Sequence, residues 1–151
     1  MRAGRRRLSW KSGPRSFPGV GSDRLVITAP EGFVATIQQG PDFAVYRLRK
    51  LSPLGQPPSS CGIYLGSNPD YQYRQTEAPP DKVTPLKGKL FGKKAERQTW
   101  SAANRATSET IVPYPKGNGM AVHVFCSAGS PEEVTALRAV AETLRVEEPH
   151  R

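Results

Sequence analysis

The sequence predicts an α+β domain: an antiparallel sheet of about six to eight short strands with one amphipathic C-terminal helix packed on one face. Three observations predict this fold class. Short apolar runs alternate with polar residues through the middle of the chain. Glycine and proline are frequent, with 14 and 15 residues among 151, and a single helical pattern closes the chain. With a hydrophobic content of only 36%, this composition favours a small β-rich domain over a helical bundle.

The first strands are predicted from runs of alternating residues between turns. Residues 24–28, 33–38 and 43–49 are rich in β-branched and aromatic side chains, and turn residues separate them at 30–32 and 40–42. Strands that follow one another at about ten-residue intervals are typical of neighbouring antiparallel strands. We therefore expect these three segments to form a meander.

The second half of the sheet is predicted from one more strand and two hairpins. Cys61, Ile63 and Leu65 share one face of a strand, after which residues 66–85 form a long proline-containing loop. We expect one hairpin from residues 86–91 and 95–101 around Gly92-Lys93-Lys94. A second pairs residues 110–114 with 120–126, because Asn118-Gly119 supplies the positive φ angles of a tight turn.

The closing helix is predicted from its start signal and its apolar spacing. Ser130 has the features of an N-cap, Pro131 suits the first helical position, and Glu133 completes a capping box. We place Arg138 off the apolar stripe and Arg145 at the helix C-terminus, where a positive charge is favourable. The stripe consists of Val134, Leu137, Val140, Ala141 and Leu144.

Basic residues gather at the start of the chain. The formal net charge is +9, and residues 1–22 contain six basic and no acidic side chains. Gly, Pro, Ser and Arg dominate this segment, so we predict a disordered basic arm over residues 1–22. We expect a single domain over residues 23–146 and a short tail over residues 147–151.

Targeting signals are weak in this sequence. Arginines at positions 5–7 resemble the start of a twin-arginine export signal, but no apolar segment follows them. No apolar run approaches the roughly 20 residues that span a bilayer, so we expect no transmembrane segment. The default expectation is a cytoplasmic protein, with export left open if the start of the chain is mis-assigned.

Several short segments carry a family resemblance. These are APEGF at residues 29–33, GPDF at 40–43, GIYLG at 62–66 and the helix end AETLR at 141–145. Together, over residues 24–146, they resemble small exported or lipid-anchored bacterial domains of unknown function, and more loosely PsbP-like domains. The resemblance implies a non-catalytic accessory or binding role. The chain departs from these families in having no signal peptide and no lipid-attachment cysteine near its start.

The sequence contains few residues or motifs that could form a catalytic, metal or cofactor site. His123 is the one histidine before the C-terminal tail, and a Cys61–His123 pair is the remaining catalytic hypothesis. No zinc spacing, phosphate loop or dinucleotide fingerprint is present, so we expect no enzyme, metal or cofactor. For Cys61 and Cys126 we favour buried free thiols, with a disulfide as the alternative.

Two surfaces are candidates for binding. The first is the long loop, where Tyr71, Tyr73 and Arg74 are residue types favoured at protein interfaces. The second is the Lys82–Arg97 cluster, which could bind nucleic acid together with the N-terminal arm. Lysines also commonly protect exposed strand edges, so the cluster has a structural alternative. Its residues are Lys82, Lys87, Lys89, Lys93, Lys94 and Arg97. We expect a protein partner or ligand first and nucleic acid second.

Overall fold

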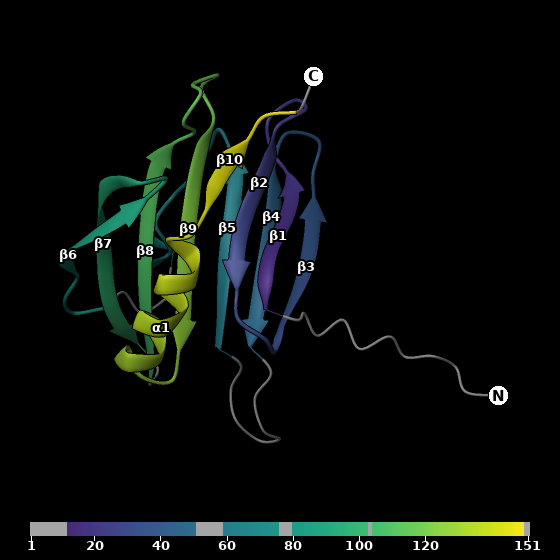
Figure 1. Cartoon of the computed structure of the whole chain (residues 1–151). Coiled ribbons are helices and arrows are strands. Elements are labelled where there is room, and N and C mark those ends of the chain that lie inside the picture. The colour runs from purple at the N-terminus through teal and green to yellow at the C-terminus, as the bar shows by residue number, and fades with distance from the viewer. Residues whose placement is uncertain (1–11, 51–58, 76–79, 103, 150–151) are drawn as a thin grey trace.

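The computed structural model describes residues 12–50, 59–75, 80–102 and 104–149. Its main element is a seven-stranded antiparallel sheet with strand order β3-β4-β5-β9-β8-β7-β6 (Figure 1). The strands of this sheet are β3 (Phe33–Gln39), β4 (Ala44–Lys50), β5 (Ser59–Gly66), β6 (Thr84–Leu90), β7 (Lys93–Ala102), β8 (Arg105–Pro113) and β9 (Ala121–Ala128). The predicted combination of an antiparallel sheet with a single C-terminal helix is confirmed.

A second sheet contains three strands in the order β1-β2-β10. They are β1 (Gly13–Pro18), β2 (Arg24–Ala29) and β10 (Arg145–Glu147). The expected meander is therefore wrong in its first member, because residues 24–29 pair with β1 and β10 and not with β3. In the large sheet, β3, β4 and β5 pair in sequence order, and so do β6, β7, β8 and β9.

The predicted disordered arm is also wrong where the structure describes it. Residues 13–18 form β1, and Phe17 is buried with its ring stacked on Tyr46 at a centroid distance of 4.9 Å. The Tyr46 hydroxyl donates a hydrogen bond to the Pro18 carbonyl. One aromatic contact and the β2 ladder thus order a segment whose composition indicates disorder. Residues 1–11 of the arm lie outside the described residues.

The β6–β7 hairpin turns one to two residues earlier than predicted. Phe91 and Gly92 connect the strands and both have positive φ angles, 53° and 72°. Two consecutive left-handed residues are characteristic of the tight turn that matches strand twist. Gly92 was expected in the turn, whereas Lys93 and Lys94 belong to β7.

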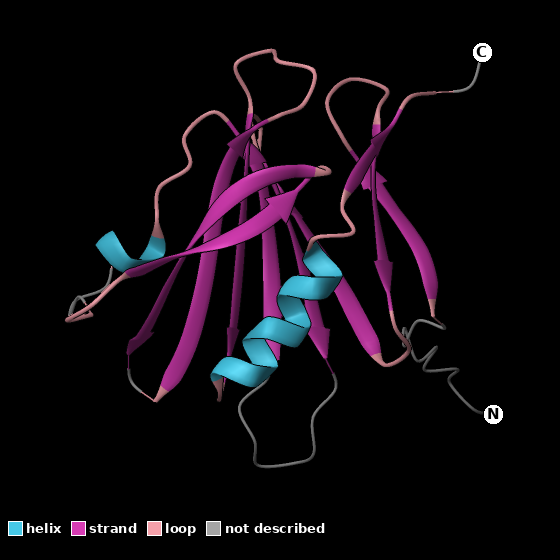
Figure 2. Cartoon of the chain, turned by 60° about the vertical axis from the view of Figure 1, so that its left-hand side comes forward, coloured by secondary structure: helices cyan, strands magenta, loops and turns pink. Residues whose placement is uncertain are grey.

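Helix α1 (Pro131–Ala141) begins as the sequence predicts and lies across one face of the large sheet (Figure 2). The Ser130 hydroxyl accepts a hydrogen bond from the Glu133 amide at 3.3 Å. The Glu133 carboxylate accepts from the Ser59 hydroxyl at 2.7 Å, so it joins the helix start to β5. The helix ends at Ala141, and Arg145 begins β10 instead of closing the helix.

The core lies between α1 and the facing side of β5, β8 and β9. Cys61 and Cys126 are direct partners across β5 and β9, and they are joined by a disulfide. The favoured interpretation of free thiols is therefore wrong, because the strands that carry the two cysteines are neighbours in register. Buried apolar residues around the bond include Leu48, Ile63, Leu65, Val122, Val124, Leu137 and Ala141.

Candidate functional site

A buried acid and a buried histidine lie on the sheet face away from α1. Glu109 in β8 and His123 in β9 are 0% and 4% exposed, and Glu109 Oε1 lies 2.9 Å from His123 Nε2. The β8–β9 register places Glu109 opposite Phe125 and His123 opposite Ile111, so both side chains project from the same face. Val122 and Val124 project from the other face, toward the helix.

Glu109 accepts three further hydrogen bonds. The donors are the backbone amides of Gln72 at 2.7 Å and Tyr73 at 3.3 Å, and the Trp100 indole at 2.8 Å. Gln72 and Tyr73 lie in the short helix η1 (Gln72–Arg74) of the long loop. A buried carboxylate is stabilised when several donors surround it. Glu109 therefore ties the loop to the sheet.

The tethered loop presents Tyr71, Tyr73 and Arg74 as one group, the Tyr71–Arg74 surface. The two tyrosine rings stack at 5.3 Å, and the Arg74 guanidinium lies 5.6 Å from the centre of each ring. Arg74 is exposed, and its side chain also approaches the Asp70 carboxylate at 3.9 Å. Burial, followed by the neighbouring Tyr73 and Glu109, raises the pKa of Tyr71. The structure thus brings together the three loop residues singled out from the sequence.

A Cys61–His123 catalytic pair is not formed. The His123 ring is enclosed by Tyr71, in an edge contact at 6.0 Å, and by Phe125 at 5.0 Å. Cys61 lies on the helix side of the sheet, where its sulfur is bonded to Cys126 and approaches the Leu137 carbonyl at 3.7 Å. Within the described ranges, no group of His, Cys, Asp and Glu side chains is placed to hold a metal ion.

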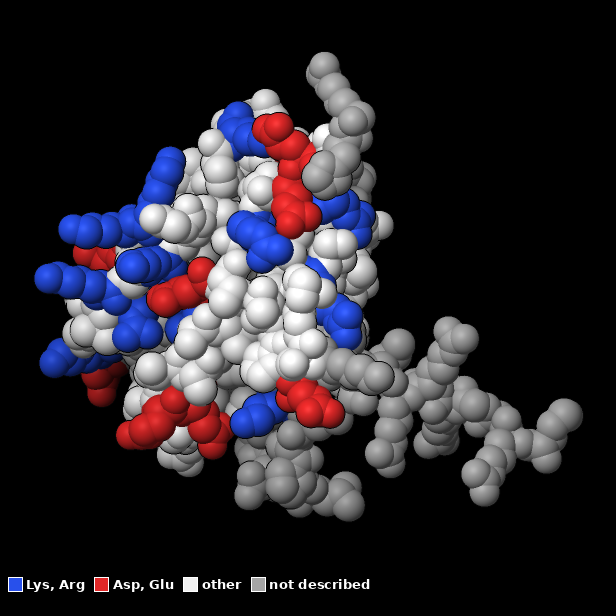
Figure 3. Space-filling view, viewed as in Figure 1, with Lys and Arg blue, Asp and Glu red and all other residues white. Residues whose placement is uncertain are grey.

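The Lys82–Arg97 cluster is divided by the sheet. In β6 and β7, strand alternation places Lys87, Lys89 and Lys94 on the face of Glu109, and Lys93 and Arg97 on the face of α1. Because β6 is an edge strand, its exposed lysines occupy the position where lysine prevents edge-to-edge pairing. Figure 3 shows basic side chains projecting from this edge. Nucleic-acid binding by the cluster stays a prediction.

Sequence reasoning missed two buried charged residues, Glu109 and Arg138. The signal for Glu109 was the predicted hairpin itself: extending its first strand back toward residue 105 places Glu109 near His123. The signal for Arg138 was spacing, since it lies four residues after Val134 and three before Ala141, on the buried side of the helix. Because arginine is charged, the sequence pattern did not indicate that Arg138 is buried.

No protein-family model matches this chain, and no curated protein or solved structure matches it. The resemblance to small bacterial domains therefore stays a prediction. Across the part of the chain that the structure describes, none of the helices is long and apolar enough to cross a membrane.

Proposed function

We propose that this chain is a small non-catalytic binding domain whose Tyr71–Arg74 surface contacts a protein partner. The observation that carries the proposal is the capture of the Gln72 and Tyr73 amides by the buried Glu109 carboxylate. This contact fixes a loop that would otherwise have to be ordered on binding. Fixing a loop in advance lowers the entropy that association costs.

The residue types on this surface support a protein partner. Tyrosine and arginine are enriched among residues that dominate interface energies, because they combine a large apolar area with polar groups. Tyr71 and Tyr73 are half-buried with their rings stacked, and Arg74 extends over them into solvent. With a chain charge of +9, the surface fits a partner that is acidic around an apolar centre.

Site-specific photo-crosslinking tests this proposal. A photoreactive phenylalanine analogue at position 73 should form an adduct with one protein in extract from the source cells. The same analogue at position 38, exposed on β3, should not. Excess unlabelled wild-type protein should suppress the adduct, and the Tyr71→Ala, Arg74→Ala double variant should not.

Two results would count against the proposal. The first is an adduct that forms equally from positions 73 and 38, or that the double variant suppresses as well as the wild type does. The second is salt-sensitive binding of a single-stranded oligonucleotide that Tyr73→Ala leaves unchanged and Lys87→Ala, Lys89→Ala weakens. That outcome would favour the nucleic-acid alternative.

A further inference from the structure

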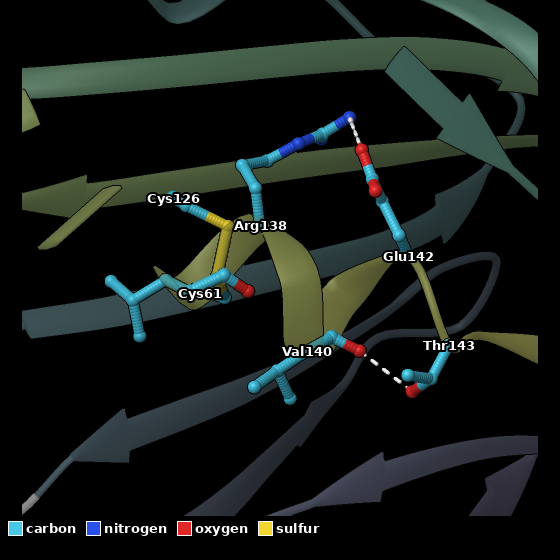
Figure 4. Close-up of a disulfide and its surroundings, with 7 residues drawn as sticks. Cys61, Cys126, Arg138, Val140, Glu142 and Thr143 are labelled. Carbon is cyan, nitrogen blue, oxygen red and sulfur yellow. Dashed lines mark hydrogen bonds and ion pairs between the residues drawn. A yellow bond between two sulfur atoms is a disulfide. The ribbon is translucent and has the colours of Figure 1, made fainter. Parts of the chain in front are cut away.

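Arg138 is a buried charge that the described residues leave without a hydrogen-bond partner. Its side chain extends from α1 and is 1% exposed, and none of its three side-chain nitrogens has a hydrogen-bond partner among the described residues. The nearest carboxylate is that of Glu142, at 4.0 Å from Nη2 (Figure 4). That distance is too long for a hydrogen bond, and Glu142 Oε1 also accepts from the Lys89 amide at 3.4 Å.

A second cation, Arg97, adds electrostatic repulsion at Arg138. Arg97 of β7 lines the same cavity as Arg138, and its Nε is also buried without a partner among the described residues. Burial lowers the pKa of Arg138 to about 10; Glu142 opposes this shift and Arg97 adds to it. Lys87 and Lys89 line the same cavity, so four basic residues and one poorly placed carboxylate leave this part of the molecule short of negative charge.

The two arginines face open space between α1 and the β6–β7 hairpin. One cavity of about 450 Å³ is lined by Arg97, Arg138, Glu142 and the backbone region of Gly88. A second of about 440 Å³ is lined by Leu86, Pro131 and Val134 together with other residues. Arg97 and Thr135 line both cavities, so the cavities adjoin. Each has the size of a small-molecule site. The first is lined mainly by charged side chains, and the second contributes the apolar side chains of Leu86, Pro131 and Val134.

We propose that this trough binds a small organic molecule through an oxyanion head, a carboxylate or a phosphate, seated between Arg97 and Arg138. The oxyanion supplies the hydrogen-bond acceptors that Arg138 lacks, and Glu142, which is 31% exposed, is the group it displaces. The apolar part of the molecule lies against Leu86 and Val134. This site is on the helix side of the sheet and does not depend on the Tyr71–Arg74 surface.

Thermal unfolding of the full chain tests the proposal, with sodium phosphate and sodium hexanoate as probes against sodium chloride at equal ionic strength. A ligand that binds only the folded state raises Tm. We expect at least one of the two anions to give a saturable rise of about 4 °C at ten times its Kd. A rise in Tm with phosphate but not hexanoate indicates a phosphate head, and a rise with hexanoate but not phosphate indicates a carboxylate head.

Three variants identify the site. Arg138→Met keeps the length and packing of the side chain and should abolish the rise, whereas Arg49→Met, an exposed arginine of β4, should keep it. Glu142→Gln should lower the half-saturating concentration about threefold, because it removes the competing carboxylate. Glu147→Gln makes the same charge change on β10 and should not alter it.

Two outcomes overturn the proposal. One is that neither anion raises Tm beyond chloride in the wild type. The other is that the rise persists in Arg138→Met, which would assign it to surface lysines or to general salt effects on stability. Far-ultraviolet circular dichroism of each variant confirms that it is folded before the titration is interpreted.

Discussion

Glu109 and Arg138 are both buried charges packed against the large sheet, on opposite faces, and their surroundings differ completely. Glu109 is 0% exposed and accepts four hydrogen bonds, from His123, Trp100, Gln72 and Tyr73. Arg138 is 1% exposed and has no hydrogen-bond partner among the described residues. Burial penalises both charges, but only the acid is compensated by donors. The hydrogen bonds of Glu109 hold the loop on the sheet, whereas the surroundings of Arg138 leave hydrogen-bonding capacity that a bound anion could use.

The polar groups near Glu109 are hydrogen-bonded, whereas several buried polar groups on the helix side of the sheet are not. Around Glu109, the Trp100 indole and two loop amides are aimed at one carboxylate. On the helix side, the buried hydroxyls of Ser108 and Thr110 have no partner among the described residues, like Arg138. On the face of the sheet that carries Glu109, the polar groups around the carboxylate form a hydrogen-bonded network. On the face that packs against α1, the core is mainly apolar, and Ser108, Thr110 and Arg138 have no hydrogen-bond partner among the described residues.

The largest expected effect comes from removing the satisfied charge. Glu109→Ala leaves the Trp100 indole, His123 and two backbone amides without their acceptor, so it should lower the free energy of unfolding by about 4 kcal/mol. Urea denaturation monitored by circular dichroism measures this loss. Glu96→Ala removes an exposed carboxylate from neighbouring β7 and should change stability by less than about 0.5 kcal/mol. Equal losses in both variants would show that Glu109 does not organise the loop.

Breaking the disulfide should have the next largest effect. The Cys61–Cys126 bond closes a loop of 65 residues beneath α1, and removing such a constraint typically costs about 3 kcal/mol. The double variant Cys61→Ala, Cys126→Ala should therefore unfold at lower urea concentration. Amide hydrogen exchange should show greater loss of protection at Leu137 and its helix neighbours than at Gln72 and Tyr73. The opposite pattern would show that the loop face depends on the disulfide more than the helix face does.

Replacing the unsatisfied charge should stabilise the protein. Without ligand, Arg138→Met removes a buried cation whose one carboxylate neighbour, Glu142, lies 4.0 Å away, and it keeps the apolar packing, so we expect a gain of about 1 kcal/mol at pH 7. The pKa of Arg138 is about 10 in the folded state, below its ordinary value, so the penalty is full at neutral pH. It declines above about pH 10, as the folded state releases the proton first. The advantage of the variant should shrink over the same range in urea titrations, and a pH-independent or negative difference would contradict this account.

The smallest expected effect concerns the unpaired hydroxyls. Thr110→Val replaces a buried hydroxyl that has no partner in the described chain with a methyl group, so stability should rise by about 0.5 kcal/mol or stay unchanged. In Thr99→Val the lost hydroxyl donates to the Thr84 carbonyl at 2.8 Å, so stability should fall by about 1 kcal/mol. Paired urea denaturation measures both. A loss in Thr110→Val as large as in Thr99→Val would mean that Thr110 is satisfied in solution.

The sequence predicted what depends on neighbouring residues. Strand alternation predicted β2 through β5 nearly to their ends, and the Ser130 N-cap predicted the start of α1. The Glu133 carboxylate, expected to complete a capping box, accepts from Ser59 instead. These features are local, because a strand pattern and a helix cap each depend on a few successive residues. The tyrosines and Arg74 were identified by residue type alone, without the Glu109 carboxylate that accepts from the Gln72 and Tyr73 amides of the same loop.

What the sequence did not predict depends on contacts between distant segments. Glu109 meets the amides of residues 36 and 37 positions earlier, and their approach depends on where the long loop crosses the sheet. Likewise, β1 was hidden by a composition typical of disorder, although Phe17 fits against Tyr46. Arg138 was expected off the apolar stripe of the helix, whereas its spacing from Val134 and Ala141 places it on the buried side.

The arrangement of the three-stranded sheet makes the resistance of the fold to stretching depend on the direction of the force. Both β1 and β10 run antiparallel to β2 and flank it, so they run parallel to each other. Gly13 begins β1 beside Ala29, and Glu147 ends β10 beside Arg24, at the opposite end of β2. Tension applied between Gly13 and Glu147 therefore acts along the strands and loads their hydrogen bonds together, in shear, instead of opening them one after another. A domain held at these two points should resist stretching far better than one pulled across its sheet.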